Sequence, residues 1–391
     1  MTTTKIILPV IVISQFCCTS LWFAGNGVMT DLTINFNLQE NALAHLTSAV
    51  QFGFIAGTLT FALLSIADRY SPSKVFLISA LLGAFFNACI VWEGNVFFSL
   101  LSFRFLTGFF LAGIYPIGMK IATDYYEKGL GKSLGFLVGA LVIGTAFPHL
   151  LKGVSTVFSW QYVMYTTTTL TVLGGVLMFI LVPDGPHRKP STKIDLRASF
   201  QVFKNVKFRA AAFGYFGHMW ELYAFWMFVP VLLHTYNKLH PKAEFNIAFL
   251  SFIVIAIGGV ACVISGYISQ YFGTKKTAQT SLLLSCICCV LSPFMFSIES
   301  ENGFLAFIIF WGIVVIADSP LLSTLVAQNT PAETKGTALT IVNCIGYFIT
   351  IVSIQLLLFT GNLLDFKYEY TLLAIGPIFG LYALTKKSQL T

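Results

Sequence analysis

Charged side chains are scarce in this sequence. Lysine, arginine, aspartate and glutamate make up 10% of its 391 residues, whereas about 25% is usual in water-soluble domains. Apolar residues make up 56% of the chain, and the mean hydropathy is +0.80. A folded chain of this composition has too few polar groups to cover its surface in water. The scarcity of charge therefore excludes a water-soluble globular protein and indicates one that lies in a lipid bilayer.

Motifs for nucleotide and metal chemistry are also missing. No G-x-x-x-x-G-K-[ST] loop occurs, so ATP-driven pumping is not expected. The eight cysteines include Cys286, Cys288 and Cys289, but no histidine or carboxylate stands beside them in the sequence. Thiols in such a setting act as small apolar residues of a membrane helix. We therefore expect no metal, no cofactor and no enzymatic activity.

Twelve long apolar stretches account for most of the chain. Each is close to the about 20 residues with which an α-helix crosses a bilayer. The first stretch follows Lys5 and could be a signal peptide, but it is long for one, and its removal would leave an odd number of spans. We predict an all-α polytopic membrane protein whose spans have the approximate limits 6–30, 42–66, 74–93, 96–122, 132–151, 160–182, 210–235, 246–271, 278–297, 303–328, 336–360 and 368–385.

Basic residues predict the orientation in the membrane. The net charge of +7 does not indicate nucleic-acid binding, because lysine and arginine are spread through short loops. If the N-terminus is cytoplasmic, 18 of the 23 basic residues lie on the inside. Cytoplasmic loops of membrane proteins carry such an excess, so both termini are predicted to be cytoplasmic. The exceptions are Lys152, Lys238, Lys242 and Lys367 on the outside and Arg104 within a span.

The longest polar stretch, residues 183–209, falls between the sixth and seventh spans. It is predicted to be a cytoplasmic linker between two six-helix bundles, residues 1–182 and 210–391. Its second part, 195–207, is predicted to form a short amphipathic helix on the inner surface of the membrane.

The two halves of the sequence repeat each other at an offset of roughly 202 to 205 residues. The segment GIYPIG of the fourth span aligns with ADSPLL of the tenth, which sets Pro116 against Pro320 and predicts bends at matching positions of the two spans. A parallel repeat of six spans is typical of transporters that bind their solute between the halves, near the middle of the membrane.

Three motifs resemble those of the major facilitator superfamily, and the resemblance covers essentially the whole chain. The loop after the second span keeps the alanine, aspartate and arginine of the family motif, with Leu64 in place of its leading glycine. The fourth and fifth spans resemble two further motifs, with Ala140 in place of the proline of the antiporter motif. The matching residues are Ala67, Asp68, Arg69, Arg104, Gly108, Ala112, Gly135, Gly139 and Gly144.

This resemblance implies two pseudo-symmetric six-helix bundles, a functional monomer and transport by alternating access. It further implies that Asp68 and Arg69 lock the inner gate, with the start of the eleventh span at Lys335 as a partner. Arg104 would take part in coupling or substrate binding. The change at Ala140 weakens the indication of antiport.

Ionisable side chains inside the predicted spans are the clearest sign of function. Glu221 lies about twelve residues, or roughly 18 Å, into the seventh span, and Asp318 lies near the middle of the tenth. An ionised group at that depth costs several kcal/mol unless it is paired or hydrated, and burial favours the protonated form of a carboxylic acid. His218 shares a helical face with Glu221. We predict that one or both of these acids bind protons, with His218 as a neighbour or relay, and that the group lines a hydrated central cavity.

A structural role is the alternative for each of these groups. Glu221 and His218 could hydrogen-bond to each other or to neighbouring helices. Asp318 could stabilise the kink that Pro320 produces. The sequence alone leaves both explanations open.

A second set of residues is predicted to line the solute cavity. Arginine keeps its charge under nearly all conditions, so Arg104 needs a carboxylate, an anion or carbonyl groups, and His149 could join it in attracting an anion. Amide and aromatic side chains could hydrogen-bond to a polar solute or stack on it, although packing also explains each aromatic residue. The predicted lining consists of Arg104, Asn26, Gln51, Tyr115, Trp220, Tyr223 and Asn343.

The leading hypothesis is a proton-coupled secondary transporter of a small polar solute in the bacterial inner membrane. Both signs of charge in the predicted lining favour a polar metabolite over a bulky apolar cation. An uncoupled facilitator is the nearest alternative. A transporter-like membrane sensor fits less well, because the longest loop has fewer than 30 residues. The expected partners are the solute, protons and the lipid bilayer, and no nucleic acid.

Overall fold

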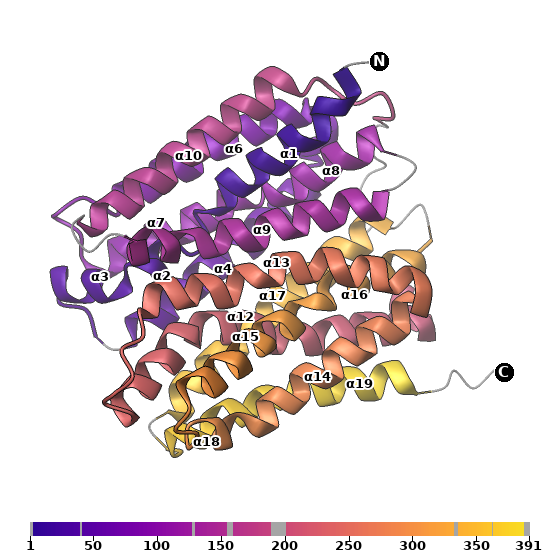
Figure 1. Cartoon of the computed structure of the whole chain (residues 1–391). Coiled ribbons are helices and arrows are strands. Elements are labelled where there is room, and N and C mark those ends of the chain that lie inside the picture. Colours follow the sequence, from indigo (N-terminus) through magenta and orange to yellow (C-terminus); the bar gives the residue numbers. More distant parts are fainter. Residues whose placement is uncertain are drawn as a thin grey trace. The chain divides into compact units, whose positions relative to one another are not determined.

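The computed structural model describes residues 3–39, 41–126, 130–154, 159–188, 201–331, 335–361 and 363–386, and every regular element in these ranges is a helix (Figure 1). Ten of the described helical segments are long and apolar enough to cross a membrane. The first apolar helix is shorter, Ile6–Thr19, and the last consists of a 3₁₀ turn followed by an eleven-residue α-helix. These elements are consistent with the twelve predicted spans.

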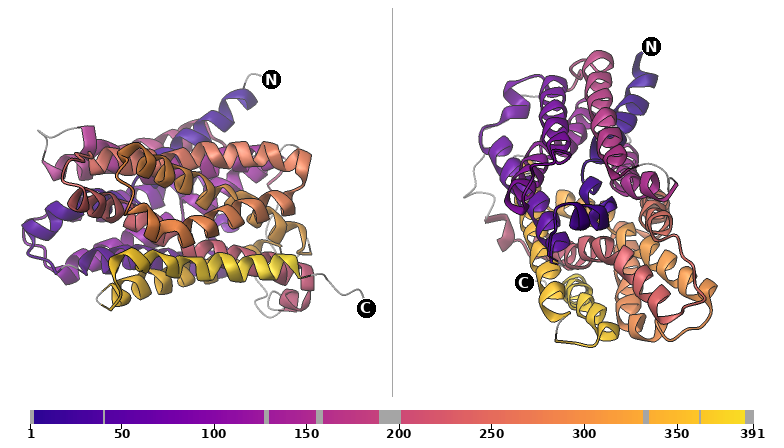
Figure 2. Two further views of the ribbon diagram at one scale, coloured as in Figure 1. Left: turned by 60° about the horizontal axis from the view of Figure 1, so that its bottom comes forward. Right: turned by 90° about the vertical axis from the view of Figure 1, so that its left-hand side faces the viewer.

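The chain divides into two compact units, Met1–Lys193 and Ile194–Thr391, which Figure 2 shows from two further directions. The bundle limits that we predict, 1–182 and 210–391 with the linker between them, stay a prediction. Residues 195–200 of the predicted amphipathic helix at 195–207 lie outside the described residues, and the rest of that stretch contains the 3₁₀ turn Val202–Lys204 and the start of the next helix at Val206.

The first unit is a bundle in which the first and fourth spans are broken. α6 packs against α7 and α10, and α1 packs against α9 and α10 (Figure 1). Its helices are α1 (Thr3–Thr19), α2 (Ala24–Gly27), α3 (Met29–Asn35), α4 (Ala42–Leu63), α5 (Ile66–Arg69), α6 (Pro72–Cys89), α7 (Phe97–Leu111), α8 (Tyr115–Tyr125), α9 (Leu130–Val154) and α10 (Trp160–Leu181).

The second unit is a bundle around one long helix, α12, which packs against α13, α15, α16, α17 and α19. α14 packs against α15, α16 and α19. The elements are the 3₁₀ turn η1 (Val202–Lys204), α12 (Val206–Leu239), α13 (Ile247–Phe272), α14 (Thr274–Met295), α15 (Glu301–Ala317), α16 (Ser319–Gln328), α17 (Lys335–Thr360), α18 (Phe366–Glu369), the 3₁₀ turn η2 (Tyr370–Ala374) and α19 (Ile375–Thr385).

The first span is not the continuous helix that the sequence predicts over 6–30. α1 ends at Thr19, and two short helices follow. The Thr19 hydroxyl donates to the Gln15 carbonyl over 2.8 Å, and the Ser20 hydroxyl donates to the Cys17 carbonyl over 2.7 Å. Hydroxyls that bond back to the preceding turn compete with the backbone and bend helices. The break therefore begins where serine and threonine replace the apolar residues of the run.

The fourth and tenth spans are broken at matching places, as the aligned prolines predict. Pro116 stands in the first turn of α8, and Pro320 stands in the first turn of α16. Proline lacks the N–H group that would bond to the preceding turn, so a new helix begins at each of them. The junction between α15 and α16 is a single residue, Asp318.

Glycines allow pairs of helices to approach closely within each unit. A Cβ atom placed on Gly108 of α7 would meet the carbonyl oxygen of Val50 on α4. In the second unit, a Cβ atom on Gly217 of α12 would meet the Gly376 carbonyl of α19. Small residues at such contacts are the usual means by which helices pack in membranes. Gly108 therefore has a packing role in the fold.

Candidate functional site

Glu221 lies in a cage of hydrogen-bond donors inside the second unit. It projects from α12 and is 1% exposed. Trp311 Nε1 of α15 donates to Glu221 Oε1 over 2.7 Å, and Ser285 Oγ of α14 donates to Oε2 over 2.9 Å. The Cys289 thiol of α14 is a third donor, 3.3 Å from Oε1. The carboxylate is therefore held by two neighbouring helices of its own unit.

This cage can accommodate Glu221 with or without a proton. An ionised carboxylate accepts all three hydrogen bonds, whereas a protonated one needs an acceptor for its own O–H. The Ser285 hydroxyl can serve as that acceptor, because its hydrogen can point instead to the Leu282 carbonyl, 3.1 Å away. The indole N–H of Trp311 can only donate, so it keeps Oε1 as an acceptor. Ser285 is thus the member of the cage that can reverse its hydrogen bond.

His218 and Asp318 form a second buried pair in the same unit. His218 Nδ1 of α12 lies 2.8 Å from Oδ1 of Asp318, which is the residue between α15 and α16. The two atoms are close enough for an ion pair, but their geometry does not meet that of a hydrogen bond. The other ring nitrogen, His218 Nε2, has no hydrogen-bond partner among the described residues. Both side chains are 1% exposed. His218 and Glu221, which the sequence places on one helical face, thus have different partners.

The second unit buries the carboxyl groups of Glu221 and Asp318 without a buried lysine or arginine in its described part. A buried carboxylate without a cation is costly, and a bound proton removes that cost. The arrangement therefore gives a chemical reason for a proton to bind at Glu221.

Aromatic and amide candidates for the solute cavity also lie on α12 and α17. The hydroxyls of Tyr223 and Tyr347 are 2.9 Å apart, and the Tyr223 ring packs edge-on against Trp226. Asn343 lies half-buried on α17. Trp220 is directed to the last span, because its indole donates to the Leu372 carbonyl over 3.1 Å. Tyr223 therefore belongs to a polar aromatic cluster with α17, and Trp220 to a contact with η2.

Arg104 lies in the first unit against the break of the first span. Its side chain is 1% exposed. Nη1 donates to the Leu21 carbonyl over 3.1 Å, and Nη2 donates to the Trp22 carbonyl over 2.5 Å. Gly25 leaves space for the guanidinium, because a Cβ atom there would lie 3.4 Å from Nε. The Arg104 guanidinium thus donates to two backbone carbonyls, and its Nε group has no hydrogen-bond partner in the described residues.

Other candidates of the first unit lie near this break. Asn26 of α2 donates from Nδ2 to Thr47 Oγ1 over 2.8 Å. His149 of α9 is buried and packs edge-on against the ring of Phe23. Gln51 is fully buried on α4. Tyr115 is half-buried at the start of α8. The structure therefore brings Arg104, Asn26 and His149 to the same broken segment.

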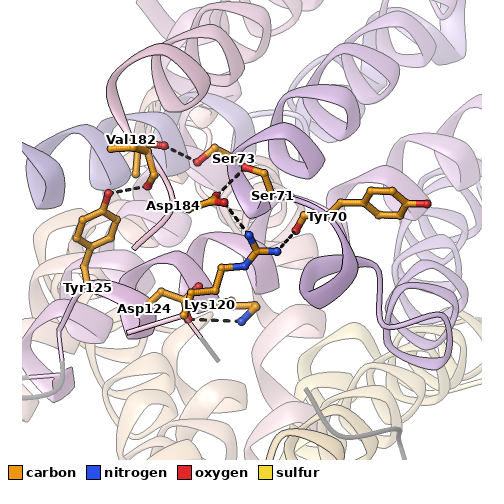
Figure 3. Close-up of polar contacts among 10 residues, drawn as sticks. Tyr70, Ser71, Ser73, Lys120, Asp124, Tyr125, Val182 and Asp184 are labelled. Carbon is orange, nitrogen blue, oxygen red and sulfur yellow. Dashed lines mark hydrogen bonds and ion pairs between the residues drawn. The ribbon is translucent and has the colours of Figure 1, made fainter. Parts of the chain in front are cut away.

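The predicted gate residues lie in the short helix α5, and the segment that follows it is bound by residues just after the sixth span. Arg69 is exposed, and the side chain of Asp68 lies outside the part of the chain that the structure describes. Next to them, the Ser71 hydroxyl donates to Asp184 Oδ1 over 2.7 Å (Figure 3). Arg188 bonds to Asp184 Oδ2 over 2.6 Å and to the Tyr70 carbonyl over 2.8 Å. The predicted contact with Lys335 joins the two units and stays a prediction.

Further contacts attach the first residues of the predicted linker to the first unit. The Ser73 hydroxyl donates to the Val182 carbonyl over 2.5 Å, and the Tyr125 hydroxyl donates to the Pro183 carbonyl over 2.6 Å (Figure 3). The backbone N–H of His187 donates to the Asp124 carbonyl over 3.0 Å. The segment after α10 is therefore fixed to the loop after the second span and to the end of α8.

Sequence reasoning missed Ser285, Cys289 and Trp311, which surround Glu221. They lie 64, 68 and 90 residues from it along the chain. Cys289 was expected to be a small apolar residue only, whereas its thiol donates to the carboxylate. A polar residue on the buried face of an apolar helix was the one available signal, because such a residue needs a partner.

Comparison with known proteins identifies similar sequences. The family model described as the Major Facilitator Superfamily matches residues 11–354. The uncharacterized MFS-type transporter YybF of Bacillus subtilis is 23% identical over 296 residues, 72% of this chain and 68% of that protein. The putative transporter AraJ of Escherichia coli is 23% identical, with coverage of 81% and 78%. The multidrug resistance protein MdtG of Proteus mirabilis is 27% identical, with coverage of 68% and 66%.

A solved structure has the same fold. It is the crystal structure of a bacterial homolog of the human lysosomal transporter Spinster, in an inward-facing and unoccupied conformation. The TM-score is 0.68, the sequence identity is 13%, and the match covers 97% of this chain and 95% of that one. The predicted all-α membrane fold is confirmed by this likeness and by the helical elements described above.

Proposed function

Because the chain belongs to the Major Facilitator Superfamily, we propose that it is a secondary transporter that moves a small polar solute by alternating access and couples this movement to protons. Members of this family are multi-pass membrane proteins that carry small molecules, and the fold agrees with that role. We assign the chain no enzymatic activity. Its place is the bacterial inner membrane, as a functional monomer with both termini in the cytoplasm.

The buried acidic groups of the second unit carry the proposal of proton coupling. Glu221 and Asp318 are each 1% exposed, and the one ion-pair partner that the described residues give either carboxylate is His218, beside Asp318. Desolvated carboxylates without a cation favour their protonated form. Ser285 offers Glu221 a partner in both protonation states. A proton can therefore be taken up and released at Glu221 without loss of its hydrogen bonds.

The proposed solute is small and polar. Its site would lie between the two six-helix bundles, residues 1–182 and 210–391, near the middle of the membrane. The proposed lining is Arg104, Asn26, Gln51, Tyr115, Trp220, Tyr223 and Asn343, with Asp68 and Arg69 as the inner gate. Tyr223 supports this assignment, because its hydroxyl pairs with that of Tyr347 and both can bond to a solute.

A cationic drug is the second candidate solute. It is favoured by the name of the Proteus mirabilis relative, a multidrug resistance protein, and by the excess of buried acids in the second unit. A thermal-shift screen of the purified protein against polar metabolites and cationic drugs decides between the two classes. Stabilisation by metabolites and not by drugs supports a polar solute, and the reverse pattern contradicts it.

Proton coupling is tested with the identified solute in proteoliposomes. We expect an imposed pH gradient to drive accumulation of the solute above its external concentration. An uncoupled facilitator would only equalise the two concentrations, and a membrane sensor would bind the solute without moving it. Equilibration that does not respond to the gradient contradicts the proposed coupling, and binding without uptake contradicts transport itself.

A further inference from the structure

A groove on the second unit has the shape of a lipid site. It lies between α13 and α14, with α15 as its floor, and encloses about 530 Å³. Its walls include Ile268 and Phe272 of α13 and Leu284 of α14, and Ala317 forms part of the floor. Ile268 and Phe272 are 41% and 68% exposed, although both are apolar. An apolar opening of this kind on a membrane-spanning helix suits an acyl chain.

Three of the four hydroxyl groups that line the groove are bound to the backbone. Ser265 Oγ donates to the Cys262 carbonyl over 3.1 Å, Thr277 Oγ1 to the Gly273 carbonyl over 3.1 Å, and Thr280 Oγ1 to the Lys276 carbonyl over 3.0 Å. Such side chains turn their methyl or methylene groups outward and leave an apolar wall. The walls therefore suit a hydrocarbon chain better than a polar solute.

The length of the groove corresponds to one leaflet of the bilayer. On α13 its lining extends from Ala261 to Phe272. Eleven residues of helix rise about 17 Å, which is roughly half of the about 30 Å hydrocarbon core. Phe272 ends α13 beside the loop to α14, which is predicted to be cytoplasmic. The groove therefore matches an acyl chain of the inner leaflet.

Lys276 supplies a positive charge at the cytoplasmic end. It is exposed, lines the groove and forms no ion pair in the described part of the chain. Its neighbour Lys275 is also exposed but does not line the groove. A lysine above an apolar groove complements a lipid with a phosphate headgroup and a net negative charge. We propose that an anionic phospholipid of the inner leaflet binds here, with its headgroup on Lys276 and one acyl chain between α13 and α14.

Binding of phosphatidylglycerol to the purified full-length protein in neutral detergent tests this site, with phosphatidylcholine of the same chains as the reference. Native mass spectrometry measures the lipid retained, and thermal unfolding measures the stabilisation. We expect phosphatidylglycerol to bind more tightly, and Lys276→Gln to weaken its binding about fivefold, as expected for one basic residue at a membrane surface. Lys275→Gln removes the same charge from the same helix and should bind like the unaltered protein.

A second variant tests the apolar part of the groove. Ile264 lines it and is 52% exposed, so a larger side chain can enter the groove without displacing the core. Ile264→Trp should reduce the retention of both lipids while the unfolding temperature without lipid is maintained. Equal binding of the two lipids, equal effects of the two lysine variants, or unchanged retention in Ile264→Trp would overturn the proposal. A protein dimer that Ile264→Trp dissociates would overturn it too, because the groove would then be an interface between copies.

Discussion

The two units bury charge of opposite sign at equivalent pairs of spans. In the first unit, Arg104 of the fourth span bonds to carbonyls at the break of the first span. In the second unit, Trp311 and Asp318 of its fourth span contact Glu221 and His218 of its first span, α12. The arginine charge is permanent, whereas the carboxylates and the imidazole can gain or lose a proton.

This difference indicates a division of roles between the units. A fixed charge that is held by carbonyls stabilises one shape of a broken helix at every pH. Titratable groups without a cation change their charge with the proton supply. We therefore expect changes in the first unit to alter transport equally at all pH values, and changes in the second unit to alter its pH dependence.

Replacement of Arg104 tests the fixed charge and is expected to have the largest effect. Arg104→Met leaves the Leu21 and Trp22 carbonyls without their donor, and a buried polar group without a partner costs about 1–3 kcal/mol. Thermal unfolding should show a clear loss of stability, and uptake should fall by the same factor across the pH range. Arg104→Lys keeps the positive charge and one donor nitrogen, so it should restore part of the stability and part of the uptake. A shifted pH profile in Arg104→Met would remove the proposed contrast between the units.

The buried pair of the second unit is tested by Asp318→Asn. Removal of this carboxylate leaves His218 without its partner, and gradient-driven uptake should fall about tenfold, within the usual range for coupling between two ligands. His218→Gln should have a similar effect. Because the two residues act as a pair, the double variant should lose little more than either single variant. Additive losses would show that they act separately.

The cage of Glu221 is tested by Trp311→Phe. The ring remains, but the N–H donor to Oε1 is lost, and hydrogen bonds to charged groups contribute about 1.5–3 kcal/mol. Since this donor favours the ionised carboxylate, half-maximal uptake should move to higher pH. Trp160→Phe is the matched control, because Trp160 is also buried but lies in the first unit, where its ring packs against Phe36. The same shift in both variants would contradict a specific effect on Glu221.

The smallest of these effects is expected for Ser285→Ala. The variant removes the group that can reverse its hydrogen bond, at a cost of about 1 kcal/mol in stability. The pH profile of uptake should change while solute binding is retained. Ser292→Ala is the control, because the Ser292 hydroxyl lies on the same helix, is buried and donates to the Cys289 carbonyl. An unchanged pH profile in Ser285→Ala would leave the serine with a packing role only.

The sequence predicts the spans well, because runs of about 20 apolar residues have few other uses. It also predicts the breaks at Pro116 and Pro320, where the missing N–H is a local property of proline. The break after Thr19 was missed because it depends on hydroxyls that bond within the helix and on a distant residue, Arg104.

The candidate site was predictable only in part. The depth of Glu221 and Asp318 in apolar runs identifies them as residues that need partners. The identity of those partners depends on which helices pack together, and Trp311 is 90 residues from Glu221 along the chain. His218 and Glu221 are three residues apart, yet His218 contacts Asp318. Spacing along a helix defines a shared face, but the neighbouring helices decide the contacts made on it.

The central claim is that the second unit carries the proton, and Glu221→Gln tests it most directly. Proteoliposomes with this variant are compared with the unaltered protein in two assays, solute exchange at equal pH and uptake driven by a pH gradient. We predict that exchange continues while gradient-driven uptake disappears. If Glu221→Gln and Asp318→Asn both retain gradient-driven uptake at the full rate and with the same pH dependence, the claim is wrong.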